Sequence, residues 1–345
     1  MFEEFGFETL TAPQAVVWFA LALGLAFGAL AQITRFCLRR SLVGEDRKQA
    51  AGIWLTALAV AVLGTQAAVA QGWIGFGDHR FMAANLPVLA VVVGGLLFGA
   101  GMVLTRGCIS RLTVLSASGN LRALTVVVIF AITAHAALKG ILSPLRTTLG
   151  SVTLPLDSAA LPGNPLIWTA VIAAAALLYA LRSGNRPGML LLAAQIGVLV
   201  PLGWVGTGFL LYDDFDPIAM ESLAFTSPMT DALFFTVAST AIPAGFGTGL
   251  IGGVLLGALA AALLSRGFQW QSFSSPSETG RYLAGGALMG FGGVLAGGCT
   301  VGAGLSGIPT LSIAAILAVT SMVIGALATN RALRAVPAAR AHPAE

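Results

Sequence analysis

Long apolar stretches recur along the whole chain, and they restrict its fold more than any other feature. Nine of them are 16 to 20 residues long, about the length that an α-helix needs to cross a hydrocarbon layer ~30 Å thick. Backbone polar groups inside a bilayer must be satisfied within the segment, which favours helices. The sequence therefore predicts an all-α polytopic membrane protein. Its nine predicted spans are 14–33, 51–70, 86–104, 121–138, 166–181, 188–205, 247–265, 281–296 and 311–329.

The composition favours the same environment, with membrane lipid around the protein. Of the 345 residues, 57% are hydrophobic and 9% are charged, whereas a soluble domain carries about 25% charged residues. The net charge of +4 does not indicate a nucleic-acid partner, because the basic residues lie in short loops, where they orient membrane proteins. Residues 1–10 are acidic and lack the basic start of a cleaved signal peptide, so we expect the mature chain to begin at Met1.

A further apolar stretch, residues 231–244, is too short to span a bilayer. It follows Ser227-Pro228 and ends at Pro243. We interpret it as a re-entrant half-helix that enters and leaves by the same face, which is tolerated where protein surrounds it.

The basic residues predict how the spans are oriented. With the N-terminus outside and 231–244 re-entrant, one face receives 15 of the 18 Lys and Arg residues, and the other receives Arg80, Lys139 and Arg146. That other face also holds the acidic run from Asp213 to Glu221. The positive-inside rule then predicts nine spans with the C-terminus in the cytoplasm. The basic segments are 34–50, 105–122, 182–187, 265–281 and the tail after Asn330.

A repeated motif contains all three cysteines of the chain. A G-x-x-x-G pair is followed nine residues after its second glycine by Cys37, by Cys108 and by Cys299. Nine of fifteen positions are identical between 94–108 and 285–299. Glycine pairs in apolar helices usually mark close helix packing, and a lone membrane cysteine is usually an inert small hydrophobe. Three cysteines in register favour a functional interpretation.

The predicted spans place the third copy of the motif in the opposite orientation to the first two. An inverted repeat of four spans, one connecting helix and four spans explains this, and such transporters bind substrate near the midplane. We therefore predict a single domain over 1–345, with repeats at about 14–140 and 188–330 around a connecting helix at 166–181. The sixth span should hold the fourth copy, with the segment Gly203–Gly208, which includes Trp204 and Thr207, in place of the cysteine. Gly253-x-x-x-Gly257 is interpreted as ordinary packing.

Short runs after Cys108 and Cys299 are poor in bulky apolar residues and predict half-helices that begin inside the membrane. The N-terminus of a helix offers free N–H groups and the positive end of its dipole, which bind anions. Thiols are weak, polarizable donors, so an anion with a terminal sulfur suits a row of them. We expect neutral thiols, because a desolvated thiolate is costly and would repel the anion. The supporting candidates are Gly107, Gly298, Thr300, Gly302, Gly304, Arg106, Glu221, Trp204 and Thr207.

Other polar residues near the cysteines allow two interpretations. Arg35, Arg39, Arg40, Arg106 and Arg111 are either topology determinants or, for Arg106, a group that attracts the anion. His135 and Lys139 lie near the end of the fourth span, where polar residues are often functional but can also snorkel. An odd number of cysteines without a C-x-x-C pair predicts no disulfide framework and no zinc site, and we expect no metal or cofactor.

The three G-x-x-x-G-x₈-C copies, the Glu221–Pro228 segment with Asp231, and the run from Gly298 to Gly304 resemble the YeeE/YedE family of bacterial sulfur-compound transporters. The resemblance covers essentially the whole chain. It implies an hourglass-shaped permease of the bacterial inner membrane that takes up thiosulfate along a line of cysteines, here Cys37, Cys108 and Cys299. It also implies, for some members, a separate small soluble sulfurtransferase-like partner.

Alternatives remain within and beyond this class. The substrate could be another sulfur or selenium species, such as sulfite, sulfide, polysulfide or a selenium compound. A membrane thiol–disulfide oxidoreductase usually needs a vicinal or loop-exposed cysteine pair, whereas these cysteines lie 71 and 191 residues apart within spans. A structural subunit is the third alternative, and we expect no enzymatic activity.

Overall fold

The computed structural model of the chain describes residues 11–335, so the predictions for residues 1–10 lie outside the described part. Eight helices in that part are long and apolar enough to cross a membrane. The remaining predicted span, 166–181, is α8 (Pro165–Leu181), an apolar helix of 17 residues. The prediction of an all-α polytopic membrane protein is thus confirmed. The other long helices are α1 (Ala12–Thr34), α3 (Arg47–Ala70), α4 (Val88–Leu104), α6 (Leu121–Lys139), α9 (Pro187–Val205), α11 (Phe246–Leu264), α12 (Pro276–Leu295) and α13 (Ile313–Ala335).

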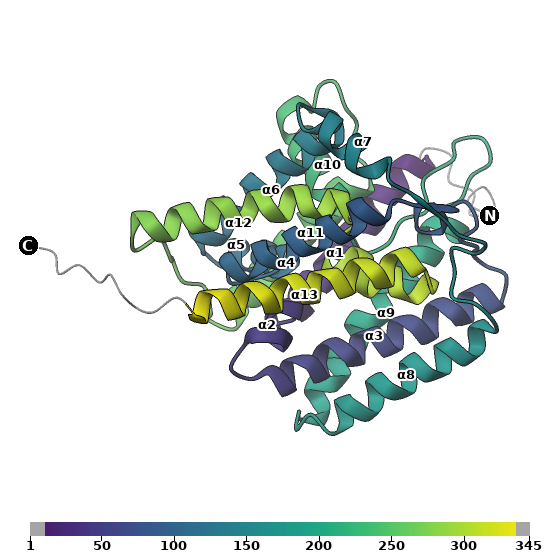
Figure 1. The fold of residues 1–345 in the computed structure, drawn as a ribbon, viewed down its shortest axis with the longest axis horizontal. Coiled ribbons are helices and arrows are strands. Elements are labelled where there is room, and N and C mark those ends of the chain that lie inside the picture. Colours follow the sequence, from purple (N-terminus) through teal and green to yellow (C-terminus); the bar gives the residue numbers. More distant parts are fainter. Residues whose placement is uncertain (1–10, 336–345) are drawn as a thin grey trace, which may run out of the picture.

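Short elements fill the ends and the interior of the bundle. The start of α1 and the end of α13 lie at opposite ends of its long axis (Figure 1). The strands β1 (Asn85–Leu86) and β2 (Leu154–Pro155) pair antiparallel in the loops. The remaining short helices are α2 (Leu38–Val43), η2 (Arg80–Met82), α5 (Ile109–Ala117), α7 (Ser143–Gly150), η3 (Gly206–Leu210), α10 (Thr226–Ala238), η4 (Thr300–Gly307) and η5 (Ile308–Thr310).

The helix predicted at 231–244 begins earlier than expected. The structure has α10 at Thr226–Ala238, so Ser227 and Pro228 lie inside its first turn and do not precede it. Proline is tolerated there because the first N–H groups of a helix have no partner within it. With 13 residues and ~1.5 Å of rise per residue, α10 is too short to cross a bilayer.

The helices pack in pairs that repeat across the molecule. The α1–α11 contact has its counterpart in α9–α3, and the α4–α13 contact in α12–α6. The short helices follow the same rule, since α2 packs on α3 as α10 packs on α11, and α5 packs on α6 as η4 packs on α13. This is the pattern that two inverted copies would make. Helix α8 packs against α3 and lies at the lower edge of the bundle (Figure 1). The repeat boundaries at 14–140 and 188–330 stay a prediction.

The glycines of the repeated motif lie at helix contacts. A Cβ atom at Gly28 would collide with the backbone of Val254 in α11, and one at Gly253 would collide with the backbone of Leu21 in α1. Gly99 meets Met322 of α13 in the same way. These glycines therefore let backbones approach closely, and the interpretation of Gly253-x-x-x-Gly257 as packing is confirmed.

Candidate functional site

Each cysteine stands at the N-cap of a short interior helix. Cys37 precedes α2, Cys108 precedes α5 and Cys299 precedes η4. Two residues before each cysteine the backbone enters the left-handed region, which ends the long helix and turns the chain inward. The residues in that conformation are Arg35 (φ 54°), Arg106 (φ 59°) and Gly297 (φ 73°). The sequence repeat is thus also a repeat of one backbone turn.

The three thiols are buried and close together. The Sγ atoms of Cys37 and Cys108 are 3.6 Å apart, well beyond the ~2.05 Å of a disulfide, and all three cysteines are free. Ser110 Oγ lies 3.3 Å from Cys108 Sγ. Thr300, which follows Cys299, lies beside Cys108. The backbone N–H of Gly302 donates to Cys299 Sγ at 3.3 Å.

The fourth position of the repeat is not where the sequence placed it. Helix α10 packs on α11 as α2 packs on α3, so α10 takes the place of α2 in the second half of the chain. By this correspondence the counterpart of Cys37 is Phe225, the N-cap of α10. The Phe225 backbone lies beside Cys299. The predicted segment Gly203–Gly208 instead lies at the end of α9 and in η3. In this copy residues 211–225 separate the long helix from the half-helix, whereas residues 35–37 do so in the first copy.

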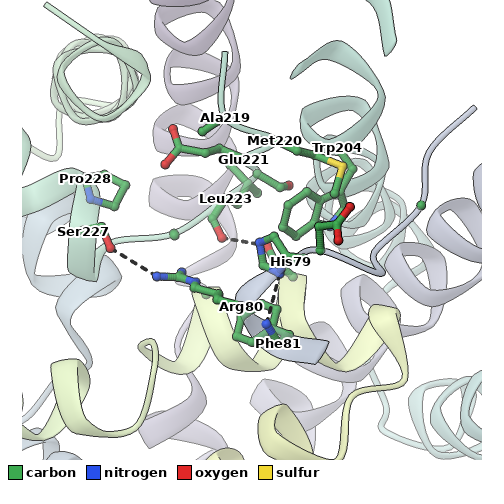
Figure 2. A pocket seen from close by; sticks show the side chains of 16 residues that line it. His79, Arg80, Phe81, Trp204, Ala219, Met220, Glu221, Leu223, Ser227 and Pro228 are labelled. Atoms are coloured by element: carbon green, nitrogen blue, oxygen red, sulfur yellow. Dashed lines mark hydrogen bonds between the residues drawn. The ribbon is translucent and has the colours of Figure 1, made fainter. Parts of the chain in front are cut away.

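One cavity, of about 410 Å³, lies at the end of the bundle where α3 and α9 end, and its wall includes Gly302, whose N–H donates to Cys299 Sγ. Its wall includes the 75–81 loop, Trp204, the 219–228 segment, and Gly302 and Ser306 of η4 (Figure 2). Glu221 N donates to Thr207 Oγ1 (2.9 Å), and Ser306 Oγ donates to Leu223 O (2.6 Å). These bonds hold the 219–225 segment between η3 and η4.

Charged groups meet inside this first cavity. Burial raises the pKa of Glu221 to about 7, the negative charge of Asp231 adds to that rise, and Arg80 opposes it. Burial, with a smaller contribution from Arg80, lowers the pKa of His79 to about 4. His79 is therefore neutral near pH 7, and its Nδ1 accepts a hydrogen bond from Phe81 N at 3.3 Å.

A second cavity, of about 610 Å³, lies at the opposite end, where α1 ends and α6 begins. It is lined by Gln32, Arg35 and Arg111 among others. Arg111 donates to Ala31 O and to Gln32 Oε1, both at 3.2 Å, and its side chain lies near Cys37 and Cys108. The thiols thus lie between two cavities that open at opposite ends.

The other predicted residues differ in their closeness to the thiols. The Thr300 hydroxyl is buried without a hydrogen-bond partner among residues 11–335. A Cβ atom added at Gly302 would meet Ala224. One added at Gly107 would meet Leu112, one at Gly298 would meet Ala303, and one at Gly304 would meet Trp54. Arg106 is exposed.

His135 packs against Phe234 of α10 with ring centroids 4.9 Å apart. Both His135 and Lys139 lie near Asp231, so the structure places them beside α10.

Sequence reasoning missed two residues that line the first cavity, His79 and Arg80. Arg80 could have been found, because it is one of only three basic residues on the face that the positive-inside rule leaves poor in Lys and Arg. His79 carries no such signal, since its role depends on a loop conformation that brings it against Trp204, with ring centroids 5.2 Å apart.

A polytopic helical protein with two opposed cavities and buried polar groups between them has the architecture of a membrane transporter. The sequence profile of the sulphur transport family matches residues 26–328, and the chain belongs to this family. The thiosulfate transporter TsuA of Escherichia coli strain K12 is 26% identical over 317 residues, which cover 83% of this chain and 85% of the relative. The thiosulfate transporter TsuA of Spirochaeta thermophila is 26% identical over 331 residues, which cover 90% of this chain and 97% of the relative.

Proposed function

We propose that this protein takes up thiosulfate and passes it along Cys299, Cys108 and Cys37. The observation that carries the proposal is the convergence of three repeat-related thiols at half-helix N-termini, with Cys37 and Cys108 Sγ atoms 3.6 Å apart. The family match and the two relatives named as thiosulfate transporters support the choice of substrate.

The chemistry of the path favours an anion with a terminal sulfur. A transported ion must exchange its water for protein donors that hold it weakly enough to release it. Neutral thiols donate S–H···S contacts to the terminal sulfur, while the N-termini of α5 and η4 face the sulfonate oxygens with free N–H groups. The distance between Cys37 and Cys108 allows one ion to contact both thiols during transfer. No bond to sulfur forms or breaks, so the protein acts as a permease without catalysis.

The orientation follows from the basic loops. The cavity at Arg80 and Glu221 opens to the periplasm, the cavity at Arg111 opens to the cytoplasm, and the protein lies in the bacterial inner membrane with its C-terminus inside. A separate small soluble sulfurtransferase-like protein could receive thiosulfate at the Arg111 side. The family resemblance is the one reason for including that partner in the proposal.

Uptake of labelled anions by proteoliposomes tests this function. We expect uptake of thiosulfate well above that of sulfate, sulfite and selenite, with empty liposomes as the control. Preference for sulfite or selenite would replace thiosulfate by another substrate of the same class. Thiol–disulfide exchange without any anion uptake would favour the oxidoreductase alternative.

A further inference from the structure

The cavity on the Glu221 side contains a cation that the path along the thiols does not use. Arg80 lies in η2, with its guanidinium carbon 5.3 Å from the centre of the Phe81 ring. Its Nη1 lies 3.4 Å from Ser227 Oγ, and Figure 2 shows the side chain reaching across the cavity toward Ser227. Among residues 11–335 the ion pairs are formed by Arg40 and by Arg122, so Arg80 has no carboxylate partner there.

Several donors besides Arg80 face or border this cavity. A guanidinium has five N–H groups in a fork that matches oxyanions, and Ser227 uses one of them. The indole N–H of Trp204 has no hydrogen-bond partner in the described chain, although Trp204 is 3% exposed and lines the cavity. The N-terminus of α10, at Thr226 and Ser227, adds the positive end of a 13-residue helix. Unpaired buried donors are costly unless a ligand or water satisfies them.

We infer that the cavity around Arg80 is a binding site for a small oxyanion, and that ionisation of Glu221 weakens this binding. The inference rests on the proposed function in one respect: it takes the bound oxyanion to be the transported substrate on its way to Cys299. Gly302 and Ser306 of η4 belong to the same cavity wall, and Arg80 lies close enough to Cys299 to interact electrostatically with it. An ion held at Arg80 would therefore lie close to Cys299, the thiol that it meets first on the proposed path.

Glu221 lies in the same cavity wall, on the 219–225 segment (Figure 2). When ionised, it attracts Arg80 and repels an anion; when protonated, it does neither. The pKa of Glu221, raised to about 7, makes its neutral form dominant below pH 7 and its charged form dominant above. Binding should therefore be strongest at low pH, and a bound anion should in turn favour the protonated form.

Other charged and ionisable groups surround Glu221, and two of them keep one charge state between pH 6 and 8. Arg80 stays charged throughout. The pKa of His79, lowered to about 4, leaves it neutral between pH 6 and 8. Asp78 lines the cavity, and Asp231 approaches Glu221 from α10 with Lys139 and His135 beside it. A Glu221→Gln variant distinguishes the effect of Glu221 on the pH dependence of binding from the effects of these neighbours.

Equilibrium binding of labelled thiosulfate to the purified protein in detergent, at pH 6 and pH 8 and constant ionic strength, tests the inference. If only protein with neutral Glu221 binds, affinity should fall about tenfold between the two pH values. Arg80→Gln should weaken binding at pH 6 by about tenfold or more, as expected for loss of a charged hydrogen-bond donor. Glu221→Gln should bind at pH 8 as the unaltered protein does at pH 6.

Arg146→Gln is the matched control, because it removes an equal charge from the same end of the bundle at a residue that does not line the cavity of Glu221. Arg146 and Arg80 both line a neighbouring cavity of about 460 Å³, so the control also tests whether that cavity binds the anion. Unchanged binding by folded Arg80→Gln, or a full pH dependence in Glu221→Gln, would overturn the inference. If Arg80→Gln does not fold, Arg80→Lys keeps the charge without the fork and should bind more weakly than Arg80. Sulfate as a second probe separates the two proposals: sulfate binding that depends on Arg80 and Glu221, without thiosulfate uptake, would refute the transport function and leave the site standing.

Discussion

Replacing Cys108 tests whether the thiols carry the ion. Cys108 Sγ is the central contact of the site, 3.6 Å from Cys37 Sγ and 3.3 Å from Ser110 Oγ, and the residue is 1% exposed. Alanine removes one donor at a point where water has little access. A lost hydrogen bond in a buried site costs about 1–3 kcal/mol, so uptake should fall about 5- to 150-fold if this contact is made only at the barrier.

Serine at position 108 tests whether transport needs a sulfur atom there or only a hydrogen-bond donor. It keeps a hydroxyl of similar size, but the C–O bond is shorter than C–S and the hydroxyl is harder and more strongly hydrated. We expect Cys108→Ser to recover little of the uptake lost in Cys108→Ala, measured as initial thiosulfate uptake per amount of folded protein in proteoliposomes. Thr113→Val is the control, since Thr113 lies buried on the same helix and, among residues 11–335, its hydroxyl bonds only to Ile109 O. Wild-type uptake by the Cys108→Ala, Cys299→Ala double variant would show that these thiols are packing residues.

Two further predictions concern the fold. Gly28→Ala should lower the free energy of unfolding by about 1–3 kcal/mol, as overpacking does, because its Cβ would collide with the Val254 backbone. Gly252→Ala is the control in thermal unfolding, because a Cβ there meets no atom of the described chain within 4 Å. Equal stability of the two variants would contradict the assigned helix contact. A reporter fused after Ala335 should be active in the cytoplasm and one inserted at Asp214 in the periplasm; a periplasmic signal from the former would refute both the nine spans and the re-entrant α10.

Much of the architecture could be predicted because a bilayer requires each helix that crosses it to have a certain length and to be largely apolar. Eight of the nine predicted spans became helices that meet the length of a membrane crossing, and the ninth became α8. The half-helices after Cys108 and Cys299 are present as α5 and η4. The predicted start of α10 was wrong because Ser227-Pro228 is typical both of a segment that ends before a helix and of a first helical turn. Local sequence does not distinguish the two.

The membrane fold and the repeated motif with its three cysteines follow from hydropathy and residue spacing, which are properties of the chain before it folds. Which of these groups meet depends on the packing of segments that are far apart in the chain. This packing placed Cys37 and Cys108 in contact, made Phe225 the counterpart of Cys37, and brought Arg80 and Glu221 into one cavity from segments 141 residues apart in the 345-residue chain. The packing of helices from both halves of the chain sets those distances. The electrostatics of a cavity depends on them because charges interact strongly only when they are near and shielded from water.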